Sequence, residues 1–193
     1  SQPMQFVKQP SFLLILGVYS CTYTVANTIT AVCERRGNPS VGPKFVGSSL
    51  TNVACSVMKD RSFARLFGTG PPRTMPVPSF ALFAVRDSMT IFASFTMPEL
   101  VERHFGCCAN TAQLVTPCAM QFVSAPLHLL GLDLYNRQER GISATNRMGF
   151  IAREYLLTAF ARCTRILPAF GIGGVVNREG RIAALSALSK YYR

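Results

Sequence analysis

The chain has 193 residues, of which 49% are hydrophobic and only 15% are charged. Soluble domains carry about 25% charged residues, so this composition argues against an ordinary soluble domain. The formal net charge is +11, and the basic residues lie between apolar segments without a recognisable nucleic-acid-binding motif. We therefore expect membrane lipids, and not nucleic acid, as partners of these charges. The seven cysteines form no C-x-x-C pair, which argues against a zinc site or a secreted disulfide framework.

The first uncharged stretch predicts a membrane-spanning helix over Ser11–Cys33, because no charge falls between Lys8 and Glu34. This segment also contains polar side chains, such as those of Thr22 and Asn27. They predict a helix that packs against its neighbours through hydrogen bonds and does not simply face lipid. A buried helix of a soluble protein is the alternative.

A long basic connection, Glu34–Thr74, follows the first crossing. Within it, Lys44–Phe67 has the pattern of an amphipathic helix at the membrane surface that ends in a basic cluster. We expect its apolar residues to face inward, namely Phe45, Leu50, Val53 and Val57. Anionic head groups, cardiolipin above all, are expected near five basic residues, although these charges could also be solvated topology signals. The five are Arg35, Arg36, Lys59, Arg61 and Arg65.

The second predicted crossing, Met75–Pro98, carries Arg86 and Asp87 near its middle. Each of these charges costs about 2.5–3.5 kcal/mol when it faces lipid, so both are expected to face protein or water. Two interpretations remain open. The pair lines a polar cavity that binds a charged solute, or it is a buried structural ion pair that needs further partners. Those partners are expected among Arg162, Arg165, Asn27 and Gln113.

A third crossing, Gly106–Leu132, is predicted to be kinked by its prolines. A fourth, Tyr155–Val176, must accommodate Arg162 and Arg165. The chain is thus predicted to be one all-α integral membrane domain, residues 1–193, with about four transmembrane helices and amphipathic surface helices in the connections. The excess of basic residues in the connections 34–74 and 133–154 places both on one side, with both termini opposite.

A weak internal repeat divides the chain into half-repeats 11–104 and 105–181, because the sequence of Arg86–Arg103 can be aligned with that of Arg165–Arg181. The segments 161–173 and 124–138 resemble mitochondrial carrier proteins, whose repeats join two membrane helices through an amphipathic helix. After Pro126, however, His128 stands at the family's acidic position and Gly131 at its basic one. Only two repeats can be drawn where that family has three. The resemblance implies a carrier-like, multi-pass scaffold of the mitochondrial inner membrane.

Enzymatic activity is not expected, because the serines and cysteines lack a nucleophile motif and His104 and His128 have no metal-ligand spacing. No cofactor is expected other than a bound anionic lipid. Two functions remain. The first is a non-catalytic subunit that scaffolds other membrane subunits in a larger assembly, such as a respiratory complex or ATP synthase. The alternative is a carrier-like transporter of a small anionic solute, held by the intramembrane groups Arg86, Arg162 and Arg165, with Asp87 beside them.

Overall fold

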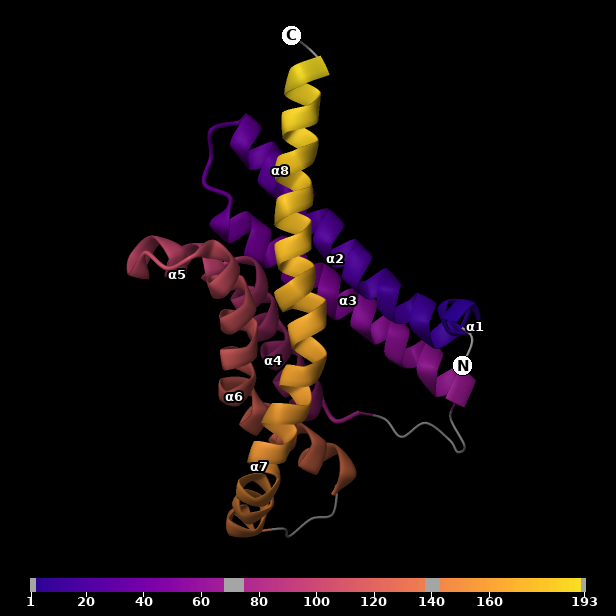
Figure 1. The fold of residues 1–193 in the computed structure, drawn as a ribbon. Helices are drawn as coiled ribbons and strands as arrows, with labels where there is room; N and C mark the ends of the chain where they lie inside the picture. Colours follow the sequence, from indigo (N-terminus) through magenta and orange to yellow (C-terminus); the bar gives the residue numbers. More distant parts are fainter. Residues whose placement is uncertain (1–2, 68–74, 138–142, 192–193) are drawn as a thin grey trace.

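The computed structural model describes residues 3–67, 75–137 and 143–191, and every regular element in these ranges is a helix (Figure 1). A π-helical turn, η1 (Leu167–Ile172), joins the last two helices into one rod. The α-helices are α1 (Pro3–Val7), α2 (Pro10–Arg35), α3 (Val41–Phe67), α4 (Val77–Phe95), α5 (Met97–Phe105), α6 (Ala109–Asn136), α7 (Ala144–Ile166) and α8 (Gly173–Tyr191).

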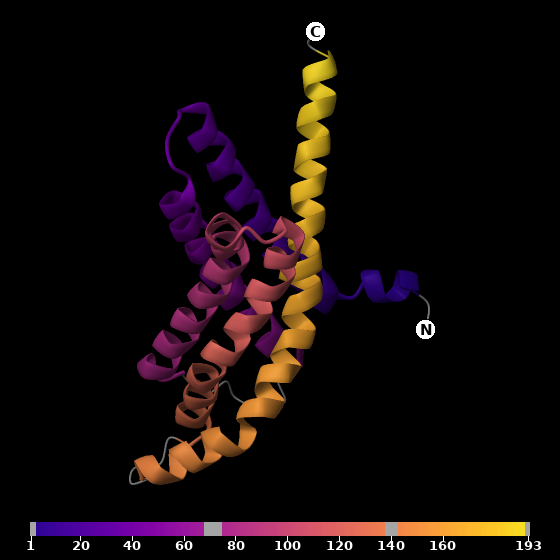
Figure 2. The same cartoon turned by 60° about the vertical axis from the view of Figure 1, so that its left-hand side comes forward.

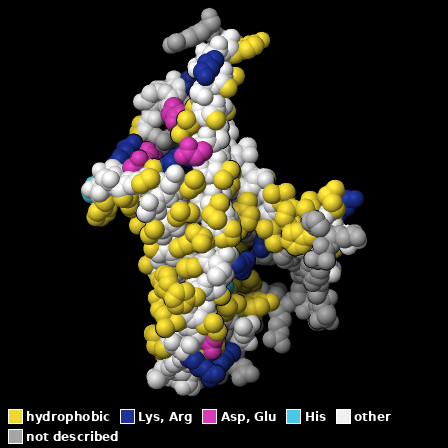
Figure 3. Space-filling model, viewed as in Figure 1, with side chains coloured by type: hydrophobic (Ala, Val, Ile, Leu, Met, Phe, Trp, Pro, Cys, Tyr) yellow, Lys and Arg dark blue, Asp and Glu magenta, His cyan; other side chains and the backbone are white. Residues whose placement is uncertain are grey.

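In the described part of the chain, three helices are long and apolar enough to cross a membrane: α2, α6 and the rod Ala144–Tyr191. The bent pair α4 and α5 gives a fourth when it is counted as one span. Large apolar side chains such as Leu13 and Val123 face outward, whereas Gln121 is completely buried. Figure 3 shows apolar side chains across the middle of one face, with most charges toward its two ends. The protein is therefore an all-α, multi-pass membrane protein with about four crossings, as predicted.

Prolines explain the breaks in these helices. Pro98 has no amide hydrogen for the Ser94 carbonyl, and α4 and α5 meet there at an angle of 48°. The Gln113 side chain donates to this Ser94 oxygen at 2.9 Å instead. In the same way, Pro126 leaves the Phe122 carbonyl without its helical donor, and the Tyr155 hydroxyl bonds it at 3.0 Å. Side chains from neighbouring helices thus satisfy backbone groups that lipid could not.

Helices α4 and α6 pack along each other, the α2–α3 hairpin packs on one side of them, and the rod α7–η1–α8 runs along α6 (Figures 1 and 2). The C-terminal half of α8 extends beyond the rest of the molecule in both views.

Helix α3 is oriented only partly as predicted, since Phe45, Val53 and Val57 are half-buried but the fourth expected residue is not. Leu50, expected inside, is 67% exposed, whereas Lys44, Ser48 and Asn52 are buried. Of the predicted inward residues, Phe45 does pack inside, with its ring centroid 5.4 Å from that of Phe92. The burial of these polar residues has a physical reason: in a membrane the outer surface is apolar, so the polar side chains of an amphipathic helix turn toward the protein interior.

The two basic connections do not lie on one side, as the charge count predicted. Helix α3 runs back beside α2, and Lys44 near its start pairs with Glu99 of α5 at 3.4 Å. Pro39 therefore lies at the α5 end of the bundle, whereas Asn136 ends the long helix α6 at the opposite end (Figure 1). The charge count treated residues 34–74 as one unit on one side. Helix α3 is not among the four apolar spans, yet its 27 residues run along the bundle from the α5 end toward the other end (Figure 1).

Candidate functional site

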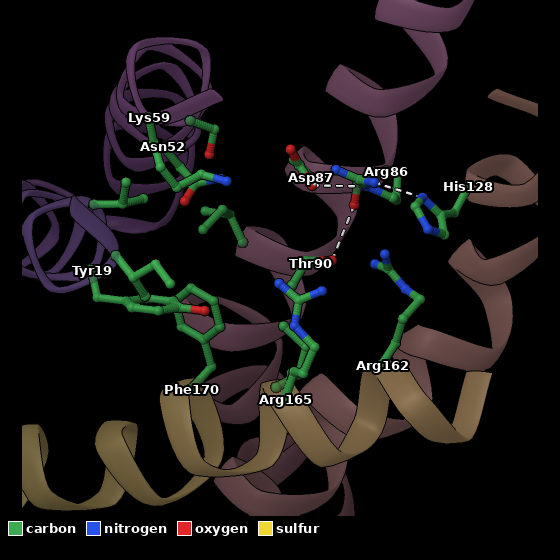
Figure 4. Close-up of a pocket in the computed structure, with 15 residues that line it drawn as sticks. Tyr19, Asn52, Lys59, Arg86, Asp87, Thr90, His128, Arg162, Arg165 and Phe170 are labelled. Atoms are coloured by element: carbon green, nitrogen blue, oxygen red, sulfur yellow. Dashed lines mark hydrogen bonds and ion pairs between the residues drawn. The ribbon is translucent and has the colours of Figure 1, made fainter. Parts of the chain in front are cut away.

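A cavity of about 330 Å³ lies between α2, α3, α4, α6 and the α7–η1 junction (Figure 4). Its volume falls within the roughly 300–1,000 Å³ of small-molecule sites. We call it the basic cavity, because four of its five charged lining residues are cations: Lys59, Arg86, Asp87, Arg162 and Arg165. All four intramembrane residues singled out from the sequence thus face one space.

Arg86 is held by two neighbours. Its Nε and Nη2 atoms donate to Oδ1 of Asp87 at 2.8 and 2.6 Å, and Nη1 bonds Nδ1 of His128 at 2.7 Å. Its guanidinium also lies over the Phe83 ring, 4.9 Å from the ring centroid. These contacts fix the Arg86 side chain and leave Oδ2 of Asp87 without a hydrogen bond to any residue that the structure describes.

The bond to Arg86 determines the state of His128. A guanidinium can only donate, so Nδ1 of His128 must accept and carries no proton. The imidazole is therefore neutral, with its proton on Nε2. Sequence reasoning missed this role because it considered His128 only as a carrier-motif position and as a metal ligand. The polar side chain in the middle of a predicted crossing was the signal that could have found it.

Arg162 and Arg165 lie three residues apart on α7 and both point into the basic cavity (Figure 4). Arg162 donates through Nε and Nη2 to Oε1 of Gln121, at 3.0 and 2.7 Å. This amide acceptor is neutral and leaves the positive charge uncompensated. Arg165 makes no hydrogen bond or ion pair with any residue that the structure describes. Two guanidinium groups without a carboxylate of their own form a binding site for a ligand carboxylate.

A second cavity, of about 260 Å³, lies toward the α5 end of the bundle. We call it the polar cavity. Asn27 and Gln113, predicted as partners of the Arg86–Asp87 pair, line this cavity instead. Asn27 exchanges hydrogen bonds of 2.7 and 3.1 Å with Asn177, and Gln113 bonds backbone carbonyls. Both residues lie too far toward the α5 end to reach the pair, so that prediction was wrong.

The structure separates the five basic residues predicted to contact lipid. Arg35 and Arg36 are exposed at the end of α2, whereas Lys59 lines the basic cavity. Lys59 lies 18 residues after the start of α3 at Val41, about 27 Å along the helix at 1.5 Å per residue. The side chains of Arg61 and Arg65 lie outside the described residues. Lipid contact therefore stays a prediction for two separate groups.

One family model, described as probable citrulline exporter, matches residues 1–184 of the chain. No curated protein and no solved structure matches the chain. The resemblance to mitochondrial carriers was therefore wrong. The pattern that suggested it, arginine and proline followed by small residues, has a local cause here. Pro168 lies in the first positions of the π-helical turn, and Gly173 and Gly174 allow Tyr23 and Gln113 to approach η1 and α8 closely. The match also fits the transporter alternative better than a scaffolding subunit.

Proposed function

Because the chain belongs to the probable citrulline exporter family, we propose that it exports citrulline, or an amino acid with the same groups, through the basic cavity. One observation carries this proposal. The cavity presents Arg162 and Arg165, without carboxylate partners among the described residues, together with the carboxylate of Asp87. Such a set of charges suits a small zwitterion.

Citrulline carries an α-carboxylate, an α-ammonium group and an uncharged ureido group. Its carboxylate would bind Arg162 and Arg165, because guanidinium groups match carboxylate geometry. Its ammonium group would bind Oδ2 of Asp87. The ureido group both donates and accepts hydrogen bonds, and polar neutral side chains line the same cavity, among them Tyr19, Asn52 and Thr90.

The placement of the site also supports transport. The breaks in α4–α5 and at η1 flank the cavities, and helices interrupted at membrane depth are typical of transporter binding sites. A π-helical turn is rare and is found mostly at functional sites. Charged residues at this depth suggest a solute pathway by default.

A small organic anion is the second candidate. It is favoured by the excess of cations in the basic cavity, where Asp87 is the one carboxylate among the described lining residues. A substrate with two carboxylates would use more of these cations than citrulline would.

Efflux from proteoliposomes loaded with radiolabelled citrulline tests the proposal. Competition with unlabelled ornithine, glutamine and a dicarboxylate distinguishes a zwitterion site from an anion site. Arg165→Gln and Arg162→Gln should each slow efflux about tenfold or more, because each removes a charge-assisted hydrogen bond. Arg153→Gln is the matched control, since its side chain lies on the same helix and is 85% exposed. Normal citrulline efflux by Arg165→Gln, or none by the wild type, would contradict the proposal.

The membrane and its lipids are further proposals. We propose the mitochondrial inner membrane as the location, which subcellular fractionation of the tagged protein tests.

Anionic lipid is proposed at Arg35 and Arg36, exposed where α2 ends. Native mass spectrometry of the wild type and of the double variant Arg35→Gln/Arg36→Gln should show lipid retained only by the wild type.

A further inference from the structure

The basic and polar cavities are separated by a layer of aromatic rings. Phe170 lines the basic cavity, and Tyr23 and Phe95 line the polar cavity. The ring centroids of Tyr23 and Phe95 are 4.9 Å apart, and those of Phe95 and Phe170 are 5.8 Å apart. Tyr19, on the side of the basic cavity, packs 5.1 Å from Phe170. We call Tyr23, Phe95 and Phe170 the aromatic layer.

One face of α3 connects the two cavities. Lys44 lines the polar cavity, and Asn52 and Lys59 line the basic cavity. Lys44, Ser48 and Asn52 are spaced four residues apart and are all buried, so they lie in one row along the helix. A buried polar row beside both cavities is what a hydrophilic pathway past the aromatic layer requires.

The polar cavity has balanced charges, unlike the basic cavity. Three carboxylates and three cations line it: Glu34, Glu99, Glu102, Lys44, Arg178 and Arg181. Arg178 bonds Asn110 at 2.5 Å and Glu179 at 2.8 Å, yet its Nε atom is buried without a partner among the described residues. A buried guanidinium N–H without an acceptor is costly, and turning the Arg178 side chain toward a substrate carboxylate in this cavity would supply the acceptor.

Three polar contacts between helices border the polar cavity. Lys44 of α3 pairs with Glu99 of α5 at 3.4 Å. Glu34 of α2 pairs with Arg181 of α8, and the Asn27–Asn177 amide pair joins the same two helices. These polar contacts at the α5 end can be exchanged for water, as the contacts of a gate must be.

We propose that the polar cavity is a second station of the export pathway, which receives the zwitterion from the basic cavity past the aromatic layer. Arg178 binds the substrate carboxylate there, and the Lys44–Glu99, Glu34–Arg181 and Asn27–Asn177 contacts form the gate. This inference rests on the proposed function. Gln113 connects α4 to η1 between the two cavities. Its Nε2 atom donates to both the Ser94 carbonyl of α4 and the Phe170 carbonyl of η1, each at 2.9 Å.

Cross-linking the gate tests this assignment. In the double variant Asn27→Cys/Asn177→Cys, oxidation should join α2 to α8 and abolish most citrulline efflux from proteoliposomes, and a reductant should restore it. Equilibrium binding of citrulline to the purified, cross-linked protein should stay within about twofold of the reduced form, because the basic cavity is untouched. Each single cysteine variant, oxidised in the same way, controls for the native cysteines. Unchanged efflux after complete cross-linking would overturn the proposal.

Arg178→Gln tests the station itself. It should slow efflux about tenfold while citrulline binding at the basic cavity stays unchanged, whereas Arg153→Gln should alter neither. Normal efflux by Arg178→Gln would show that the polar cavity does not bind the substrate.

A measurement without substrate separates failure of the gate from failure of the proposed function. Thr30 lines the polar cavity, so Thr30→Cys reports access by a charged thiol reagent, with the parent chain as background. Labelling should be several-fold faster when Glu34→Gln and Glu99→Gln weaken the gate. Equal rates would overturn the gate whether or not the protein carries citrulline. Absence of citrulline binding by the wild type would contradict the proposed function alone.

Discussion

Arg86 and His128 join α4 to α6 at the basic cavity through a bond of 2.7 Å between Nη1 and Nδ1. The bond requires a neutral imidazole, because an imidazolium has no acceptor for a guanidinium. It therefore keeps a cation and a titratable ring together without like-charge repulsion, and it holds Arg86 against Asp87 beside the proposed ammonium site.

His128→Leu should lower stability and slow citrulline efflux, whereas His128→Gln should retain most of both. Leucine leaves Nη1 of Arg86 without an acceptor in a half-buried site, at a cost of about 1–3 kcal/mol. Glutamine supplies an amide oxygen in place of Nδ1. Thermal unfolding in detergent and proteoliposome efflux measure the two effects. Equal behaviour of the two variants would show that the hydrogen bond is unimportant.

Gly174→Ala should destabilise the protein more than Gly180→Ala. A Cβ at Gly174 collides with the Gln113 side-chain amide, whereas a Cβ at Gly180 has nothing within 4 Å. Displacing Gln113 leaves the Ser94 and Phe170 carbonyls without their donor, which costs about 1–3 kcal/mol for each buried group. Thermal unfolding in detergent compares the two variants, and equal melting temperatures would contradict the role given to Gln113.

Cysteines introduced at Pro39 and Asn136 should be labelled from opposite sides of the membrane. The α2–α3 turn lies beside α5, and the end of α6 lies at the other end of the bundle (Figure 1). An impermeant thiol reagent, applied to sealed and then to permeabilised vesicles, reports the side of each residue against the parent chain. Labelling of both cysteines from the same side would instead support the topology predicted from the charge count, with both basic connections on one side.

The crossings could be predicted from the sequence because hydrocarbon imposes a simple requirement, about 20 apolar residues in succession. Met75–Pro98, for example, contains all of α4 and ends where Pro98 breaks the backbone. The mid-membrane charges Arg86 and Asp87 were found for the same reason, since a charge at that depth stands out against its neighbours.

The partners of these charges could not be predicted, because they come from remote segments. His128 is 42 residues from Arg86, and Gln121 is 41 residues from Arg162. Such pairs depend on how α4, α6 and α7 pack, which the pattern of one segment does not encode. The orientation of α3 was predicted only in part for a related reason. Its amphipathic pattern defines two faces, and only the packing beside α2 and α4 decides that Asn52 points inward and Leu50 outward.

Cys108 should react with water-soluble thiol reagents at a lower pH than an ordinary cysteine. It is exposed and occupies the N-cap position of α6, just before the first helical residue, Ala109. The nearby backbone amides of Asn110 and Thr111 lower the pKa of this thiol, because they favour the thiolate. The thiolate is the reactive form, so the labelling rate rises with pH and levels off earlier than for a cysteine in an unstructured peptide. Iodoacetamide labelling across a pH series measures this, with Cys108→Ser subtracting the other cysteines. A difference signal that follows the peptide curve would contradict the lowered pKa of Cys108.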